Sequence, residues 1–258
     1  IDRSNNDTVE DESHMQDKEK SITMATNNDE QRIIVSRNGP YLVLGEIPIS
    51  EQIILADSEG TANEWREGKK YQYKEKCMLC RCGKSKNKPF CDGTHIRVSF
   101  DGTETADHEF SSSQIREIDG PTLKLKDAEI LCASARFCHG AGGIWNLVLQ
   151  SSDEEARRIA IEEACNCPSG RLVVCDKKTE RAFEPEMERS IGLIEDPQVR
   201  SSGPIWVRGG IPVKPADGKI YETRNRVTLC RCGKSSIKPF CDSSHFPEHR
   251  YEEMMSRK

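Results

Sequence analysis

Three cysteines and one histidine gather in the segment LCRCGKSKNKPFCDGTH, residues 79–95. Cys80 and Cys82 are separated by one residue, Cys91 follows nine residues later, and His95 follows after four more. Thiolates are soft ligands suited to zinc, Cu(I) and iron–sulfur clusters, and imidazole binds several of the same metals. This spacing therefore predicts a metal centre with sulfur and nitrogen ligands.

A second segment, LCRCGKSSIKPFCDSSH at 229–245, repeats the spacing without an insertion, and 12 of 16 positions are identical between 80–95 and 230–245. Upstream, GPYLVLGEIPI (39–49) recurs as GPIWVRGGIPV (203–213). The chain therefore contains one small module twice. The first copy is longer between its halves, around DSEGTANEWREGKKY, and we expect this addition to be a surface excursion.

Strands must position both copies. The segment before the cysteines of each copy is either continuously apolar or alternates between apolar and polar residues. Glycine and proline interrupt these segments, which is typical of short β-strands. Cys77 aligns with Val227 in the other copy, so we expect Cys77 to be a buried strand residue and not a ligand.

The pattern C-x-C-x2-S-x3-P-x-C-D-G-T-H over 80–95 resembles the CDGSH iron–sulfur domain of the mitoNEET-like family. The resemblance implies a 2Fe-2S cluster with Cys80 and Cys82 on one iron and Cys91 and His95 on the other. A structural zinc site is the alternative, because three cysteines and one histidine are also an acceptable zinc set.

The second copy departs from the first by carrying Ser243 in place of Gly93, and it keeps every ligand position. The resemblance implies a second 2Fe-2S cluster, held by Cys230, Cys232, Cys241 and His245. Members of the family pair two modules around a twofold axis. Two modules in one chain therefore imply an internal pseudo-dimer, compatible with a monomeric protein.

Between the copies lies a different pattern. TLKLKDAEI is typical of a strand, and SSDEEARRIAIEEA is typical of a helix, with Ser152 and Glu155 in capping-box register. RLVVC and IGLIED are expected to complete an α+β unit over 105–196.

The cysteines of this middle unit form a third group. Five residues separate Cys132 from Cys138, and Cys167 precedes a proline. Overlaid on the ferredoxin run C-x2-C-x2-C with a distant C-P, the middle cysteine falls at Ala135. The segment resembles the divergent single-cluster ferredoxin domain, which implies a 3Fe-4S cluster on the three cysteines. Cys165 as a fourth ligand would give 4Fe-4S.

The middle unit contains two further side chains of types that can bind metal, His139 and Cys175. We expect His139 to be a surface group or a neighbour of the ligands, and Cys175 to be a buried strand residue. HGAGG, at 139–143, is expected to be a loop beside the middle site.

The predicted organisation is α+β: a disordered acidic tail (1–31), a first module (32–104), a ferredoxin-like middle unit (105–196) and a second module (197–258). The tail contains nine acids, three bases and few apolar side chains, too few to bury a core. Met24 is the expected native start. A net charge of -5 argues against nucleic acid or a membrane surface as partner, and the absence of a signal peptide or a long apolar run predicts a cytoplasmic protein.

These observations favour an electron-transfer protein with two 2Fe-2S clusters and one 3Fe-4S or 4Fe-4S cluster. Iron–sulfur cluster storage, cluster transfer, or redox or pH sensing is the alternative, and a structural metal-binding protein is the third interpretation. We expect no enzyme activity, because the sequence contains no nucleophile elbow and no phosphate-binding loop in the required context.

Basic residues surround both repeated sites in an acidic chain. They are Arg81, Lys84, Lys86 and Lys88 in the first copy and Arg224, Arg226, Arg231, Lys234 and Lys238 in the second. They form either a solvated rim or a docking face for an acidic redox partner, such as a flavoprotein reductase or another ferredoxin.

Overall fold

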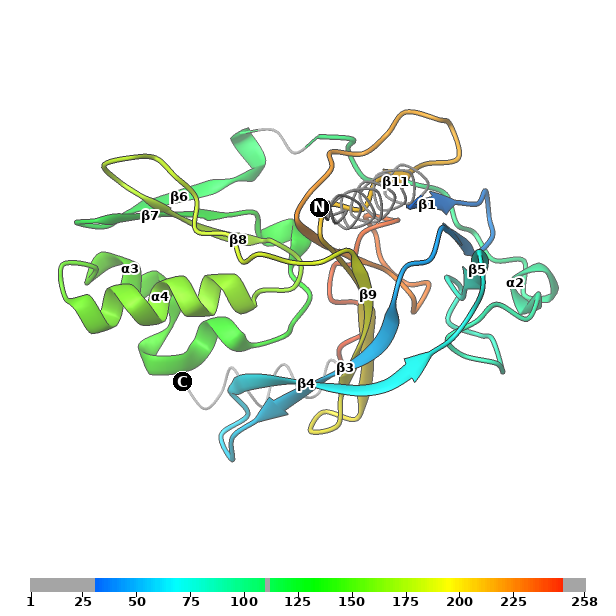
Figure 1. The fold of residues 1–258 in the computed structure, drawn as a ribbon, viewed down its shortest axis with the longest axis horizontal. Coiled ribbons are helices and arrows are strands. Elements are labelled where there is room, and N and C mark those ends of the chain that lie inside the picture. The colour runs from blue at the N-terminus through cyan, green and yellow to red at the C-terminus, as the bar shows by residue number, and fades with distance from the viewer. Residues whose placement is uncertain (1–30, 110–111, 248–258) are drawn as a thin grey trace, which may run out of the picture.

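The computed structural model describes residues 31–109 and 112–247, so the predicted tail over 1–31 lies almost entirely outside them. The first module contains β1 (Arg32–Val35), β2 (Tyr41–Leu44), β3 (Ile49–Ala56), β4 (Ala62–Tyr71), β5 (Lys76–Leu79) and α2 (Thr94–Arg97). The middle unit contains β6 (Arg116–Asp119), β7 (Leu123–Asp127), α3 (Ile144–Leu149), α4 (Glu154–Asn166), β8 (Leu172–Asp176) and β9 (Ser190–Asp196), with 3₁₀ helices at Ser112–Gln114, Glu129–Leu131 and Phe137–Gly142. The second module contains β10 (Ser201–Arg208), β11 (Val213–Lys214) and β12 (Arg226–Leu229). The fold is α+β and rich in strands (Figure 1).

The two modules exchange strands. One sheet has the order β11-β1-β2-β5 and another has the order β12-β10-β9-β3-β4. β11 of the second module pairs parallel with β1, aligning Val213 with Ile33. β3 of the first module pairs parallel with β9, aligning Ile49 with Ile191. Because Ile49 and Val213 are equivalent positions of the repeat, the exchange is reciprocal.

β9 is the structural counterpart of β1. Leu193 of β9 lies opposite Ile205 of β10, just as Val35 of β1 lies opposite Tyr41 of β2. The sequence interpretation placed IGLIED with the middle unit, but this strand pairs only with strands of the five-stranded sheet. The repeat is hidden here because Leu193 precedes its partner Ile205 by 12 residues, whereas Val35 precedes Tyr41 by only six.

The expected surface excursion of the first module is instead a strand. β4 pairs antiparallel with β3 along the edge of the five-stranded sheet (Figure 1). Its Trp65 ring stacks on Phe137 of the middle unit, with ring centroids 4.7 Å apart, and lies 4.8 Å from the Trp206 ring. Aromatic packing therefore fixes this hairpin against the segment that carries the middle cysteines.

The middle unit is a three-stranded antiparallel sheet, β6-β7-β8, with α3 and α4 packed along it (Figure 1). The predicted strands at TLKLKDAEI and RLVVC are present, and Cys175 is buried in β8 as expected. The predicted helix is also present, but its N-cap is Asp153, whose carboxylate accepts a hydrogen bond from the Ala156 N–H at 2.9 Å. Asp153 caps in place of Ser152 because α4 begins at Glu154, one residue after it.

One apolar core is shared by the two modules, with residues of β1, β2, β9, β10 and β12 packed together. Cys77 is a half-buried residue of β5 that packs on this core, and burial raises the pKa of its thiol to about 12. Within the ranges that the structure describes, no helix has the length and apolar character needed to cross a bilayer.

Candidate metal centres

The first site begins where β5 ends. Cys80 and Cys82 are buried, and their sulfurs are 3.8 Å apart. The Cys80 N–H donates to the Pro89 carbonyl at 2.8 Å, and the Cys91 N–H donates to the Met78 carbonyl at 2.8 Å. These backbone bonds hold the strand end beside the loop that returns with the third cysteine.

Cys91 and His95 form the second half of this site. The Cys91 sulfur lies 3.2 Å from Nδ1 of His95, across the start of α2. The Asp92 carboxylate accepts hydrogen bonds from the backbone N–H groups of Lys86 and Thr94 at 2.9 and 3.0 Å, and these bonds lower the pKa of Asp92. The turn that joins the two ligands is therefore fixed by its own side chain.

The second site has the same geometry. The sulfurs of Cys230 and Cys232 are 3.6 Å apart, and the Cys241 sulfur is 3.4 Å from Nδ1 of His245. Burial, with a further effect of the Arg231 charge, lowers the pKa of His245 to about 4. The hydrogen bond with Cys232 lowers the pKa of Cys230 to about 6. A neutral imidazole and a readily ionised thiol are both suited to metal ligation, whereas burial raises the pKa of Cys241, the thiol beside His245.

The donor arrangement tests which metal group fits. Each site consists of two close pairs, and in the described part of the chain no three His, Cys, Asp or Glu side chains gather tightly enough to hold one metal ion. Tetrahedral zinc requires four donors around one atom. Two separate pairs fit a group with two metal atoms better, so the residues present are compatible with a two-iron cluster.

The two loops are packed back to back. A Cβ atom added to Gly83 would lie 2.5 Å from the Cys232 carbonyl oxygen, and one added to Gly233 would lie 2.8 Å from that of Cys82. The Tyr41 hydroxyl of the first module also donates to the Cys230 carbonyl at 2.8 Å. The two repeated sites are thus neighbours joined by direct backbone contact.

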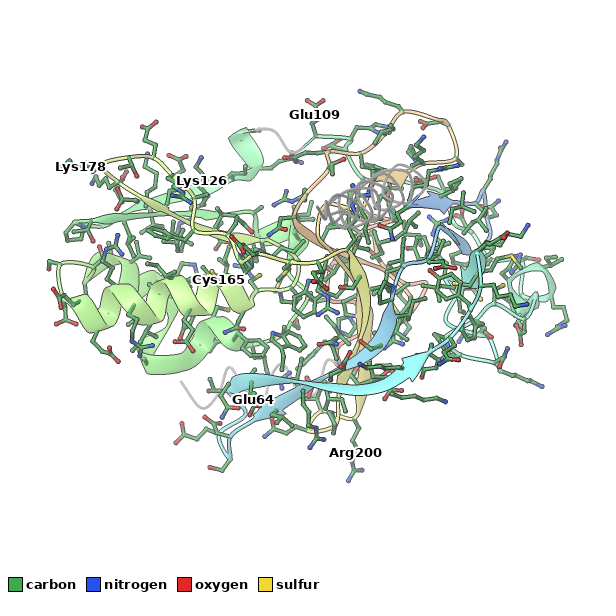
Figure 2. All side chains as sticks on the ribbon, in the orientation of Figure 1. Glu64, Glu109, Lys126, Cys165, Lys178 and Arg200 are labelled. Atoms are coloured by element: carbon green, nitrogen blue, oxygen red, sulfur yellow. The ribbon has the colours of Figure 1, made fainter. Side chains whose placement is uncertain are left out.

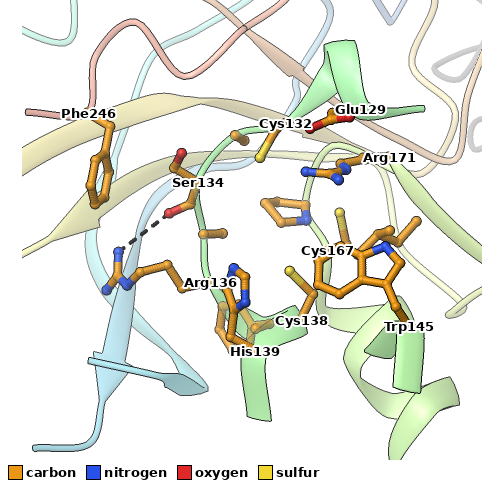
Figure 3. A pocket seen from close by; sticks show the side chains of 15 residues that line it. Glu129, Cys132, Ser134, Arg136, Cys138, His139, Trp145, Cys167, Arg171 and Phe246 are labelled. Atoms are coloured by element: carbon orange, nitrogen blue, oxygen red, sulfur yellow. Dashed lines mark hydrogen bonds between the residues drawn. The ribbon is translucent and has the colours of Figure 1, made fainter. Parts of the chain in front are cut away.

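The middle site is a cavity of about 320 Å³ lined by Cys132, Cys138 and Cys167. Figure 3 shows the three sulfurs directed toward a common space. Burial raises the pKa of the Cys138 thiol, and the nearby Cys167 and Cys132 thiols raise it further. The three cysteines therefore line one cavity, as the ligands of a shared cluster would.

The sequence analysis missed Arg171, which lines the same cavity. Its guanidinium is 2.6 Å from the Asp127 carboxylate and interacts with the Cys132 thiol (Figure 3). A fixed positive charge favours thiolates in the cavity. The only signal was the position of this residue just after the CPSG turn.

Cys165 does not line the cavity. It lies on the last turn of α4, and its sulfur is directed to the Phe183 carbonyl oxygen at 3.7 Å (Figure 2). His139, expected to be a surface group or a neighbour of the ligands, is half-buried and lines the cavity with the three thiols. The structure therefore brings together Cys132, Cys138 and Cys167 and leaves Cys165 outside.

The predicted basic rim is only partly exposed. Arg81 and Arg226 are each 1% exposed, which corrects their assignment to a surface face. Arg81 lies between the rings of Tyr41 and Phe100, at 5.5 and 5.8 Å from their centroids. Arg226 points inward because backbone carbonyls inside the protein accept hydrogen bonds from its planar guanidinium. Arg81 donates from Nη1 to the Ser36 carbonyl at 3.3 Å, while its Nε and Nη2 have no hydrogen-bond partner among the described residues.

Of the other basic residues in the predicted rim, some donate hydrogen bonds to backbone carbonyls and the rest are exposed to solvent. Arg231 is half-buried and donates to the carbonyls of Gly203 and Ile194, and Arg224 donates to the Gly170 carbonyl at 2.8 Å. The exposed members are Lys84, Lys86, Lys88 and Lys234, whereas Lys238 is half-buried.

Comparison with known families agrees with these three sites. Residues 38–96 and 202–246 match the family described as iron-binding zinc finger CDGSH type, and residues 118–177 match the divergent 4Fe-4S mono-cluster family. No curated protein and no solved structure matched the chain. The protein is therefore an iron–sulfur protein in which two regions of the CDGSH iron-binding family flank one region of the divergent 4Fe-4S mono-cluster family.

Proposed function

We propose that this protein is a one-electron carrier with two 2Fe-2S sites and one 3Fe-4S site. The observation that carries the proposal is the contact between the repeated sites, where Gly83 abuts the Cys232 carbonyl and Gly233 abuts that of Cys82. Iron–sulfur clusters exchange single electrons at potentials set by their ligands and surroundings. Metal sites that only stabilised separate domains would not need to lie next to each other. Sites that pass electrons to one another must be close. The proposal assigns the chain no reaction of its own.

The reciprocal strand exchange supports an internal pseudo-dimer. β3 and β11 each complete the sheet of the other module, and both modules contribute strands to the shared core. An interface of this kind is as intimate as a domain core. We infer that one chain supplies the paired arrangement that the family resemblance implies, and that a monomer is sufficient.

The three-thiolate assignment of the middle site is supported by the orientation of Cys165 toward Phe183. If the site holds four irons, the cavity offers His139 as the nearest alternative donor of this chain. The unpaired state of all 12 cysteines is compatible with a reducing compartment, so we propose a cytoplasmic location.

The test is the iron and sulfide content of anaerobically purified protein, with absorption and EPR spectra before and after reduction. We expect about seven irons per chain, divided two, two and three. With about eight irons, Cys165→Ser should keep that number and His139→Ala should lower it. A colourless protein that contains zinc would contradict the proposal.

Cluster transfer is the second candidate, favoured by the exposure of the first site. Cys91 and His95 are half-buried, and the adjacent Ile96 is 74% exposed, so an acceptor protein can approach this site. Incubation with an apo-acceptor separates the two functions. Loss of iron from the first site to the acceptor, faster than electron exchange, would favour transfer.

We also propose that an acidic redox partner, such as a flavoprotein reductase or a ferredoxin, docks at this exposed face. The exposed lysines Lys84, Lys86 and Lys88 lie in the ligand loop, and the apolar Ile96 and Val98 follow His95. Positive charge around an apolar centre is a common arrangement for steering a charged partner.

A further inference from the structure

The two repeated sites differ at one backbone position that has the same conformation in both. Gly93 has φ of 80° and Ser243 has φ of 71°, so each lies in the left-handed region. Glycine adopts this conformation at little cost, whereas a residue with a Cβ atom is strained there. A strained residue beside a ligand indicates a compensating contact that deserves a functional explanation.

The compensating contact is with the middle site. The Ser243 hydroxyl donates to the Cys132 carbonyl oxygen at 2.6 Å and accepts a hydrogen bond from the Ser134 hydroxyl at 2.8 Å. Cys132 provides the first thiol of the middle cavity, and Ser134 lines the same cavity. One side chain therefore joins the ligand loop of the second module to that of the middle unit.

Within the described residues, the ligand loop of the first module has no such link. A Cβ atom added to Gly93 would meet nothing within 4 Å. The residue after the histidine also differs between the copies: Ile96 is 74% exposed, whereas the ring of Phe246 lies 5.8 Å from the Arg136 guanidinium of the middle unit. Arg136 is buried and ion-paired with Asp196, so this second contact is also fixed in place.

We propose that Ser243 is a positioning residue that fixes the Cys132 loop against the second repeated site, so that the middle site is coupled to the ligand loop of the second module and not to that of the first. Together with the contact between Gly83 and Cys232, this places the three sites in the order middle, second, first. The inference rests on the proposed function, because the order matters only if the sites exchange electrons or metal.

The test compares Ser243→Ala, Ser243→Thr and Gly93→Ser in the full, metal-loaded chain. Ser243→Ala keeps the Cβ atom and removes the hydroxyl, Ser243→Thr keeps the hydroxyl, and Gly93→Ser adds a hydroxyl where nothing is within reach. The readouts are the EPR line shape and midpoint potential of the middle centre, and the rate at which a chelator removes its metal.

We expect Ser243→Ala to alter the EPR signature of the middle centre and to accelerate its loss about two- to tenfold, which corresponds to one hydrogen bond. Ser243→Thr should restore both properties, and Gly93→Ser should leave the middle centre unchanged. Circular dichroism of each variant checks that the fold is retained. Equal rates and spectra for Ser243→Ala and the parent protein would overturn the inference. If the parent chain contains only zinc, the proposed function fails, and the relative rates of zinc release still decide the role of Ser243.

Discussion

The guanidinium of Arg226 in the second module donates to the carbonyl oxygen of Cys167 in the middle unit at a distance of 2.6 Å. It also donates to the carbonyl of Ala164 at 2.5 Å and to the carboxylate of Glu184 at 2.9 Å. Since β12 runs from Arg226 to Leu229 and Cys230 follows it, one strand contacts the cysteine segment of the middle site at its start and leads into a candidate ligand of the second site at its end. The equivalent residue of the first module, Lys76, is exposed.

Removal of the Arg226 guanidinium should destabilise the middle unit. In Arg226→Met the Glu184 carboxylate loses its buried partner and four backbone carbonyls lose their donor, so we expect a loss of about 2 to 4 kcal/mol of unfolding free energy. Urea titration followed by the absorbance of the middle centre measures this loss. Lys76→Met is the matched control, and it should change stability by less than about 0.5 kcal/mol. Similar losses in the two variants would contradict the role assigned to Arg226.

The contact between the repeated loops predicts a different effect at Gly83. Gly83→Ala adds a Cβ atom 2.5 Å from the Cys232 carbonyl at a left-handed φ of 72°, so overpacking adds to backbone strain. We expect a cost of about 2 to 5 kcal/mol. Gly218→Ala, at a φ of 89° with nothing within 4 Å, should cost only the backbone part of about 1 to 2 kcal/mol. Equal costs, measured by thermal and urea unfolding, would show that the loops do not adjoin.

The local part of the sites was predictable from sequence, because all ligands of each repeated site lie in one short loop. Burial of Arg81 and Arg226 was not predictable, since their partners come from distant segments of the chain. The placement of β9 with the middle unit was wrong, because the larger sequence separation between its residues and their partners in β10 obscures the repeat. The Ser243 substitution was visible in the sequence, but its partner Cys132 lies 111 residues away along the chain.

Glu163 on α4 predicts a pH dependence of stability. Burial, together with the Glu162 charge, raises the pKa of this carboxyl to about 8, and its Oε2 has no hydrogen-bond partner within the described ranges. Between pH 4.5 and about 8 the folded state retains a proton that the unfolded state releases, so stability falls as pH rises through this window.

Glu163→Gln removes this effect and should become more stable than the parent protein as pH increases, by less than about 1.4 kcal/mol per pH unit. Unfolding free energies at pH 5 and pH 8 measure the difference. Glu154→Gln, in the first turn of the same helix, should shift stability by a nearly constant amount. Parallel pH profiles for Glu163→Gln and the parent protein would exclude a raised pKa.

The exposed lysines of the first ligand loop predict salt-sensitive docking. Lys84, Lys86 and Lys88 carry positive charge beside a half-buried metal site in a chain whose net charge is -5. Reversal of all three to glutamate should slow reduction by an acidic ferredoxin or flavoprotein about tenfold or more at low ionic strength. Stopped-flow measurements over a range of salt concentrations should show the difference disappear as the charges are screened.

Lys178→Glu provides the control, because this residue lies at the far end of the middle unit from the first module (Figure 2). It changes the net charge without altering the ligand loop, so the reduction rate should stay close to that of the parent protein. If the reduction rate fell in proportion to net charge in both the loop variant and Lys178→Glu, the effect would come from the overall charge of the protein and not from the ligand loop. A rate that is independent of salt in every variant would mean that the lysines form only a solvated rim.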